Sequence, residues 1–245
     1  MPDHLIRKLE HFTRLSAADR LALHGLARSV RAVGRHQDLL RDGDSPRHVS
    51  LVLEGWACRY KQLEDGRRQI VAHVLPGDFC DGYLLVLRAL DHAVGTLTPV
   101  RVAEIPSTAL MEVLDQHPRI MQALWWETLV AAAIQREWTV SLGQRTALER
   151  VAHLFCELFW RLRMIGLTEG DTCPLPLTQV EIADTLGLTN VHVNRMLHQM
   201  RGAGLIVLKS KRLTILDLPA LQDIALFNAG YLHLGREGSH LDAEG

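Results

Sequence analysis

The stretch from Thr178 to Arg201 constrains the fold more than any other part of the chain, because it has the pattern of two short helices joined by a tight turn. Thr178 with Glu181 three residues later forms a capping box, in which each side chain satisfies a free backbone N–H group at the helix start. Gly187 stands where the chain must reverse, since a residue without Cβ enters the left-handed region with little strain. The pattern predicts a helix-turn-helix.

The second predicted helix follows Thr189 and has one apolar and one polar face. Val193, Met196, Leu197 and Met200 recur at helical spacing, and we expect them to face inward. The opposite face carries hydrogen-bond donors and acceptors of the kind that contact base edges and phosphates in the major groove. The predicted DNA contacts of the two helices are Thr178, Gln179, Thr189, Asn190, Val191, His192, Asn194, Arg195 and Gln199.

Two short β-like runs follow this helix, at residues 206–208 and 213–216. Between them Lys209, Lys211 and Arg212 form a basic tip, as in a winged helix, and are also predicted to contact DNA. The alternative is an ordinary helical hairpin packed in some other core. It is less favoured, because capping, turn glycine, polar face and basic tip occur in the expected order.

Composition limits the classes of protein to which the chain can belong. A length of 245 residues with 47% hydrophobic content indicates a chain that is folded throughout, and excludes a disordered or fibrous protein. The net charge of −1 gives no overall attraction to nucleic acid, so DNA affinity must come from a local basic patch. Without a long apolar run or an apolar N-terminal signal, we expect a cytoplasmic protein that does not contact membranes.

The four cysteines are Cys58, Cys80, Cys156 and Cys173, and no two of them form a C-x-x-C pair. This spacing indicates neither a disulfide framework nor a zinc or iron–sulfur site, so we predict no metal and no cofactor. Buried free thiols are the expected state. Cys173 is the candidate for a redox-sensing thiol, because it lies in a loop before the DNA-reading unit.

The N-terminal half changes from helical to β character. Residues 4–28 carry two helical patterns, the second with a cap formed by Ser16 and Asp19. From residue 30 to 105 short alternating runs are separated by turn formers such as Pro76-Gly77-Asp78, a pattern typical of a β sandwich or jelly roll. The expected strands are 39–40, 49–53, 56–60, 69–74, 93–97 and 100–105.

After Pro118 a helical pattern runs to about Gly143. Apolar residues at alternating four- and three-residue steps suit pairing with a second copy about a two-fold axis, although such a helix could also pack only on its own β domain. The predicted dimer interface is Ile120, Leu124, Ala131, Ile134 and Trp138. Further helices are expected at 146–165 and from 219 to about 234, with the residues after 240 frayed.

The predicted fold class is therefore α+β: an N-terminal antiparallel β jelly roll, a long dimerisation helix and a C-terminal winged helix-turn-helix. The expected domains are residues 1–117, 118–143 and 144–235. This order resembles the Crp/Fnr superfamily of bacterial transcription regulators. The motifs that carry the resemblance are Leu51-Val-Leu-Glu-Gly55, Pro76-Gly-Asp-Phe79 and the block from Glu181 to Arg195.

The resemblance implies a homodimer that places two recognition helices in successive major grooves of a two-fold symmetric DNA site, roughly 34 Å apart. It also implies RNA polymerase as a partner. By the family's motif Thr189 caps the helix and touches phosphate, while Arg195 reads guanine, whose O6 and N7 match two parallel N–H groups. Asn190 and Val191 stand where members that respond to cyclic AMP have Arg and Glu, so the site read should differ there.

The resemblance weakens in the predicted sensor half. Cyclic-nucleotide binders follow the Gly-Asp-Phe turn with Gly-Glu for the ribose and later an Arg for the phosphate, whereas here Gly82 falls on the Glu position and Asp91 near the Arg position. A phosphate beside Asp91 would be repelled, so cyclic AMP is not the expected effector, and the effector remains unknown. The effector-pocket candidates are Cys80, Asp81, Gly82, Tyr83, Asp91 and His92.

Three other readings compete with a DNA-binding regulator. A haem or metal site on His73 and His92 is less favoured than hydrogen-bonded core histidines. A cupin-like enzyme would need histidines paired on neighbouring strands, and His36, His48, His73 and His92 are too far apart in pattern, so we predict that the chain is not an enzyme. A partner-binding module would use the winged helix for protein contacts; only a DNA reader would lose duplex affinity steeply as salt rises.

Overall fold

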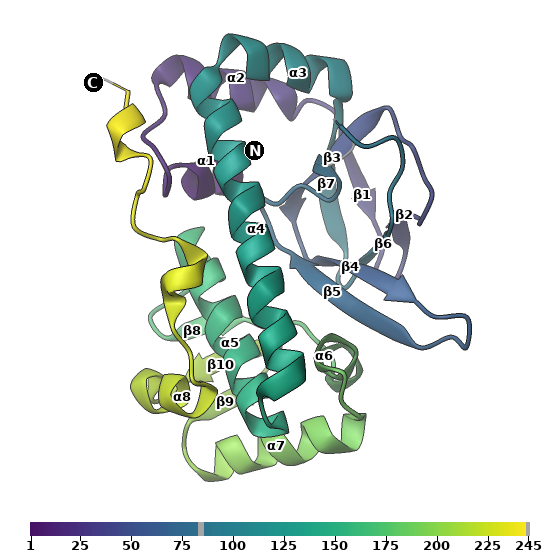
Figure 1. The fold of residues 1–245 in the computed structure, drawn as a ribbon, viewed down its shortest axis with the longest axis vertical. Helices are drawn as coiled ribbons and strands as arrows, with labels where there is room; N and C mark the ends of the chain where they lie inside the picture. Colours follow the sequence, from purple (N-terminus) through teal and green to yellow (C-terminus); the bar gives the residue numbers. More distant parts are fainter. Residues whose placement is uncertain (83–85, 244–245) are drawn as a thin grey trace.

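The computed structural model describes residues 1–82 and 86–243 (Figure 1). Tyr83, a predicted effector-pocket residue, lies outside the described residues. The chain begins with two short helices, α1 (Asp3–Leu9) and α2 (Ala17–Leu26). Ser16 and Asp19 form the predicted capping box at the start of α2.

The β region forms two antiparallel sheets, which confirms the predicted jelly roll. One sheet has the order β1 (Val30–Val33), β7 (Val100–Pro106) and β3 (His48–Glu54). The other has the order β2 (Asp38–Leu40), β6 (Ala93–Thr96), β4 (Ala57–Gln62) and β5 (Arg68–Val74). Inward-facing side chains of both sheets, Val33, Leu40, Val52, Val94 and Val102 among them, form a buried core.

The turn after β5 places the sheet region against α1. Gly77 has a φ of +90°, and an added Cβ would lie 2.7 Å from the backbone carbon of His4. Only glycine fits this close approach. The neighbouring Asp78, in the Pro-Gly-Asp-Phe motif, is thereby held beside the N-terminal helix.

Two helices follow β7. Sequence patterns did not predict α3 (Ser107–Gln116), which packs on α2 and on α4. The long helix α4 (Pro118–Gln144) has 27 residues and begins with proline in its first turn, where a missing N–H costs nothing. In Figure 1 this helix runs past the β region toward the C-terminal unit. It contacts both, since Gln135 donates to the carbonyl of Val71 on β5 (2.6 Å) and α4 packs on α5.

The C-terminal unit is a winged helix. It contains α5 (Ala147–Met164), β8 (Thr172–Pro174), α6 (Gln179–Leu186), α7 (Asn190–Gly202), β9 (Ile206–Lys209), β10 (Arg212–Ile215) and α8 (Leu218–Ala225). Gly187 ends α6 in the left-handed region with a φ of 61°, as predicted. Residues 172–174 were expected to be loop, but they pair with β10 at the edge of the small sheet.

The end of the chain differs from the prediction. Instead of a helix to about residue 234, α8 ends at Ala225 because Leu226 adopts a left-handed conformation with a φ of 49°. Residues 227–243, which we call the C-terminal strap, contain the short helices η2 (Ala229–Leu232) and η3 (Ser239–Leu241). The strap runs back to the N-terminal helices (Figure 1), where the N–H of Gly238 donates to the carbonyl of Phe12 (3.0 Å).

Three of the five predicted dimer-interface residues are buried within their own chain. Ile120, Ile134 and Trp138 are 0%, 8% and 7% exposed, so they are unavailable to a second copy, and their assignment was wrong. The reason is that α4 has apolar residues on more than one face, and the seam found by spacing is the one that packs on the chain's own cores. Leu124 and Ala131 are half-buried at its border.

Candidate DNA interface and internal cavity

Helix α7 exposes the polar stripe on which the DNA-reading prediction depends. Its apolar face, formed by Val193, Met196, Leu197 and Met200, is buried in the core of the winged helix. Thr189 caps the helix by accepting a hydrogen bond from the N–H of His192 (3.3 Å). The residues left exposed on α7 are Asn190, Val191, His192, Asn194, Arg195, His198, Gln199, Arg201 and Gly202.

The start of α6 lies beside this stripe. Thr178 is exposed and forms the capping box with Glu181. The side-chain oxygen of Gln179 accepts a hydrogen bond from the amide of Asn194 (3.2 Å). Two predicted DNA contacts from different helices are therefore neighbours on one surface.

The wing is a tight β9–β10 hairpin. Ser210 and Lys211 at its tip have φ values of 52° and 59°, the left-handed conformation of a two-residue hairpin turn. Lys209 and Lys211 are exposed. The guanidinium of Arg212 lies 3.1 Å from the carboxylate of Glu169, so the two lysines are the more available cations.

The winged helix is docked on the β region, which the sequence did not predict. Helix α6 packs on β5, and the carboxylate of Asp184 accepts hydrogen bonds from the Arg68 guanidinium at 2.8 and 3.0 Å. Gln69 donates to the backbone carbonyl of Thr185 (2.9 Å). Arg35, from the loop before β2, lies 3.3 Å from the carboxylate of Glu181.

His73 lies at this junction and serves packing. Its ring lies between Trp56 and Trp138, with ring centroids 6.1 and 5.8 Å away, and its Nε2 is 3.3 Å from the hydroxyl of Thr185. Burial, with a smaller effect of the Arg161 charge, lowers the pKa of His73 to about 3, so the ring is neutral. Among the described residues no three His, Cys, Asp or Glu side chains are grouped to hold a metal.

A cavity of about 510 Å³ lies between the β region, α4, α5, α1 and the C-terminal strap. Of the predicted effector-pocket residues, Asp91 and His92 line it. Cys80 and Asp81 are instead buried in the β roll, each 0% exposed, and Gly82 is half-buried; none of the three lines this cavity. Asp81 points inward, where its Oδ1 accepts a hydrogen bond from the Ser50 N–H (2.8 Å).

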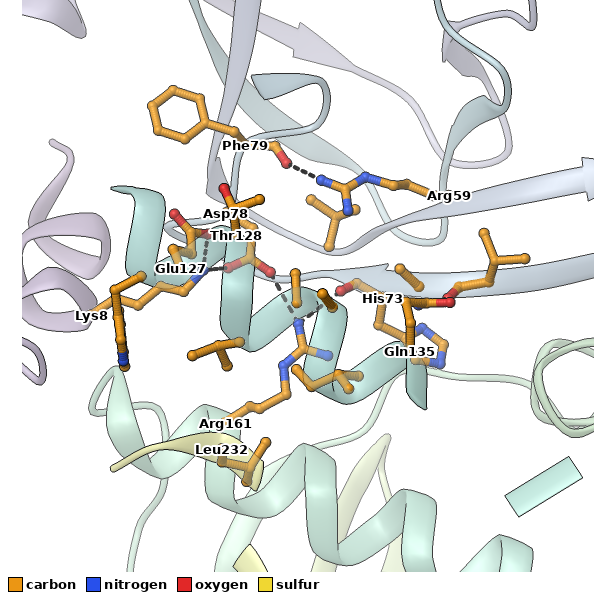
Figure 2. Close-up of a pocket in the computed structure, with 18 of the residues that line it drawn as sticks. Lys8, Arg59, His73, Asp78, Phe79, Glu127, Thr128, Gln135, Arg161 and Leu232 are labelled. Carbon is orange, nitrogen blue, oxygen red and sulfur yellow. Dashed lines mark hydrogen bonds and ion pairs between the residues drawn. The ribbon is translucent and has the colours of Figure 1, made fainter. Parts of the chain in front are cut away.

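Charged side chains from distant parts of the chain meet at one wall of the cavity (Figure 2). The ammonium of Lys8 lies 2.5 Å from the Asp78 carboxylate and also contacts Glu127. Arg161 reaches the same Asp78 from α5 at 3.1 Å and donates to the backbone carbonyl of His73 at 2.9 Å. Asp78 therefore connects the N-terminal helix to the first helix of the winged-helix unit.

The pKa shifts agree with this pairing. Burial alone would lower the pKa of Lys8, but the carboxylates of Asp78 and Glu127 raise it above its ordinary value. Burial alone would raise the pKa of Asp78, but the charges of Lys8 and Arg161 lower it. Lys8 and Asp78 are consequently both charged at neutral pH.

No local sequence pattern indicates this wall of the cavity. Lys8, Arg59, Glu127 and Arg161 stand in four separate elements, and only the tertiary fold brings them to one cavity. Arg59, on β4, donates to the backbone carbonyls of Phe79 (2.9 Å) and Cys80 (3.1 Å).

The cysteines are buried thiols. All four are free, and burial raises the pKa of Cys58, Cys156 and Cys173 to about 12. Burial also raises the pKa of Cys80. Cys173 lies inside the winged helix on β8 with no exposed surface, which does not support a redox-sensing role.

Comparisons with known proteins agree with both halves of the fold. Residues 30–117 match the family model of the cyclic nucleotide-binding domain, and residues 149–224 match that of the Crp-like helix-turn-helix domain. The solved structure of FixK2 from Bradyrhizobium japonicum superposes with a TM-score of 0.72 at 24% identity, covering 80% of this chain and 96% of that one. This likeness shows the same fold.

Two curated relatives are similar enough to show the family. The nitrogen fixation regulation protein FixK of Bradyrhizobium diazoefficiens is 34% identical over 71% of this chain and 72% of its own length. The transcriptional activator protein FnrL of Cereibacter sphaeroides is 34% identical over 72% and 71%. Both names describe regulatory proteins. In the part of the chain that the structure describes, no helix is long and apolar enough to span a membrane. The chain belongs to the Crp/Fnr family of DNA-binding transcription regulators.

Proposed function

We propose that this regulator binds a two-fold symmetric DNA site as a homodimer, with α7 of each copy in the major groove. The observation that carries the proposal is the division of α7, whose apolar face is buried while its polar stripe is exposed. Among the described residues, no carboxylate lies within ion-pair distance of Arg195, so its guanidinium is available to a base or a phosphate.

The residues on this surface divide into two roles. Arg195 is placed to read guanine through two parallel N–H groups, and Asn190 or Asn194 is suited to adenine. Val191, 77% exposed, fits against a thymine methyl group. Thr178, Gln179, Thr189, His192 and Gln199, with Lys209, Lys211 and Arg212 of the wing, would hold the helix in register through phosphates or neighbouring bases.

The exposed face of α4 is suited to be the contact between the two copies. Met121, Trp125, Leu129 and Val140 are 45%, 66%, 57% and 48% exposed, and with Ala132 and Arg136 they follow steps of three and four residues. Apolar side chains in such a row are costly in water and are covered by an equivalent row in paired helices. The interface is therefore proposed on the face one or two residues further along the helix than the seam found from spacing.

Cyclic AMP is not the proposed effector. Asp91 stands where a cyclic phosphate would need a cation, and hydrogen bonding to His92 (2.8 Å) lowers the pKa of this carboxyl, which keeps it charged. A phosphate there would meet a like charge.

We further propose a cytoplasmic protein that acts on transcription through RNA polymerase, as the resemblance to the family implies.

Replacing Arg195 by alanine tests the DNA-reading surface. Duplexes selected by the full chain from genomic fragments would be compared with scrambled duplexes in a salt titration. Arg195→Ala should lose roughly 1–3 kcal/mol on the selected site and little on scrambled DNA. Arg31→Ala is the matched control, since this half-exposed arginine on β1 pairs with Glu104 far from the winged helix.

The outcome separates the two classes of function. If the Arg195→Ala variant binds selected and scrambled duplexes as the parent does, the base-reading role is excluded. If the parent itself shows no salt-dependent duplex binding, the winged helix serves protein contacts instead.

A further inference from the structure

The cavity combines a large volume with apolar surface from every element around it. Its 510 Å³ suits a drug-sized molecule. Val71 of β5, Trp126 and Val130 of α4, Met164 of α5 and Leu232 of the strap all line it. An apolar ligand would therefore contact side chains on all sides.

The charged side chains of the described lining already have polar partners: besides the ion pairs named below, Arg59 donates to the backbone carbonyls of Phe79 and Cys80, and Asp91 is hydrogen-bonded to His92. Among the described lining residues the cations are Lys8, Arg59 and Arg161, and the carboxylates are Asp78, Glu127 and Asp91. Asp78 pairs with both Lys8 and Arg161, and Lys8 also contacts Glu127. A ligand with a net charge would have to displace these ion-pair and hydrogen-bond partners or remain unpaired away from water, both of which are unfavourable.

The strap is fixed at both ends, with the cavity between them. At the winged-helix end the hydroxyl of Tyr231 donates to the buried carboxylate of Glu157 (3.0 Å), and Leu232 is 2% exposed. At the other end Asp242 accepts a hydrogen bond from the N–H of Arg14 (2.6 Å). Gly238 packs so closely that an added Cβ would lie 2.6 Å from the ring of Phe12.

The far anchor is also connected to the lining. The ring of Phe12 stacks on Trp126 with centroids 5.6 Å apart, and Trp126 lines the cavity. Leu234, together with Leu232, gives the strap two apolar contacts with the interior of the cavity. A molecule in the cavity would touch the segment that directly follows the DNA-binding unit.

We propose that this cavity binds an uncharged, mainly apolar small molecule, and that Leu232 and Leu234 of the C-terminal strap form one wall of the binding site. The ligand is defined by its lack of net charge and by a size that fills the space between α4, α5, β5 and the strap. The inference goes beyond the proposed reading of DNA and does not depend on it.

A fluorescence titration of the full chain with the uncharged apolar dye N-phenyl-1-naphthylamine tests the class of ligand. Saturable binding of one dye per chain is expected. 1-Decanol should displace the dye, decanoate should be at least roughly tenfold weaker, and cyclic AMP should have no effect. Absence of saturable binding, or a preference for decanoate over decanol, would overturn the proposal.

Variants of the strap locate the site. The double change Leu232→Ala and Leu234→Ala should weaken dye binding roughly tenfold, because both side chains are in the lining. Leu226→Ala is the matched control, since Leu226 is 66% exposed and outside the lining. Equal dye affinity of the double variant and the control would place the dye elsewhere.

A variant in a different wall covers the case in which the double variant does not fold. Ala131→Phe introduces a ring at a half-buried lining position of α4 and should compete with the dye for space. Unchanged dye binding by a folded Ala131→Phe protein would contradict the assignment. Arg195→Ala should bind the dye as the parent does, so failure of the cavity proposal and failure of DNA reading remain distinguishable.

Discussion

Asp81 is a carboxyl group in the interior of the β roll, with no exposed surface. One oxygen accepts the Ser50 N–H, while the other has no hydrogen-bond partner among the described residues. Burial raises the pKa of this carboxyl to about 7, against an ordinary value of 3.8. Between pH 4 and 7 the folded protein therefore holds a proton that the unfolded chain has already lost.

This proton makes a testable contribution to stability. Because the unfolded state binds fewer protons in this range, the contribution of Asp81 to the free energy of unfolding falls as pH rises from 4 to 7. Asp81→Asn removes that loss and keeps an oxygen for the Ser50 N–H. In urea unfolding, the free energy of unfolding of the variant minus that of the parent should increase with pH by at most about 1.4 kcal/mol per unit.

The buried histidines change the free energy of unfolding with pH in the opposite direction, but the parent and the Asp81→Asn variant share them. Burial is the main cause that lowers the pKa of His73 to about 3 and of His153 to about 4, so they add stability as pH rises toward their ordinary value of 6.5. Their contribution cancels in the difference. Parallel stability curves for parent and Asp81→Asn would show that Asp81 does not titrate in this range.

At the scale of elements, α4 has two apolar faces with different tasks. One face, with Ile134 and Trp138, packs in the core that includes α5, and the other presents Trp125 and Leu129 to solvent. The faces are adjacent, since neighbouring residues are separated by about 100° around a helix. A dimer contact through the exposed face leaves the monomer core intact.

Charges on the two faces should therefore have different effects. Trp125→Asp with Leu129→Asp should halve the mass in sedimentation equilibrium while the chain stays folded, because two carboxylates cannot be buried between paired helices. Gln122→Asp, exposed beside this face, is the control and should leave the mass unchanged. Ile134→Asp should instead unfold the protein, through an unpaired charge in the core. An undiminished mass for the Trp125 and Leu129 double variant would remove this face from the interface.

Elements with strong local patterns could be predicted from the sequence, and those defined by distant contacts could not. The capping box of Thr178 and Glu181 and the left-handed Gly187 depend on a few neighbouring residues, so the helix-turn-helix followed from them. Which face of α4 is free to pair with another copy depends on which face the rest of the chain covers. Residue spacing along the helix holds no information about that. The left-handed Leu226, which ends α8, has no glycine or asparagine to indicate it.

At the scale of the whole molecule, the winged helix docks on the β region through a shared apolar core, which includes Trp56 and Ile70, and through polar contacts at its edge. Arg68 and Asp184 are partly exposed, with side-chain exposures of 33% and 23%, and their pair joins β5 to α6. Exposed pairs of this kind contribute little, about 1 kcal/mol or less. Loss of this pair should therefore weaken the docking only slightly and leave the apolar core in place.

Removing this pair should loosen α6 without unfolding the protein. Arg68→Ala should speed amide hydrogen exchange in residues 179–186 by up to about fivefold, because local opening becomes easier by at most about 1 kcal/mol. Arg67→Ala is the control: its guanidinium lies 2.8 Å from Asp65 within the same hairpin and does not reach α6. Identical exchange in the two variants would show that the pair does not hold the docked arrangement.

The two candidate sites, the DNA-reading stripe and the cavity, could be predicted from the sequence to different extents. The stripe on α7 was predictable, because its residues are neighbours on one helix with a fixed period. The cavity was predictable only at Asp91 and His92, because its other charged residues, such as Lys8 and Arg161, are more than a hundred positions apart. No local period relates residues at that separation.

The return of the chain end to Phe12 and Arg14 limits how the DNA-reading unit can move. The unit is tethered twice, covalently through the link between α4 and α5 and non-covalently through residues 227–243. The unit can rotate in one of two ways. Either the rotation axis leaves both connections in place, or the C-terminal strap first dissociates from the N-terminal helices. In the second case the hydrogen bonds of residues 227–243 to Phe12 and Arg14 add to the free-energy cost of reorienting the unit.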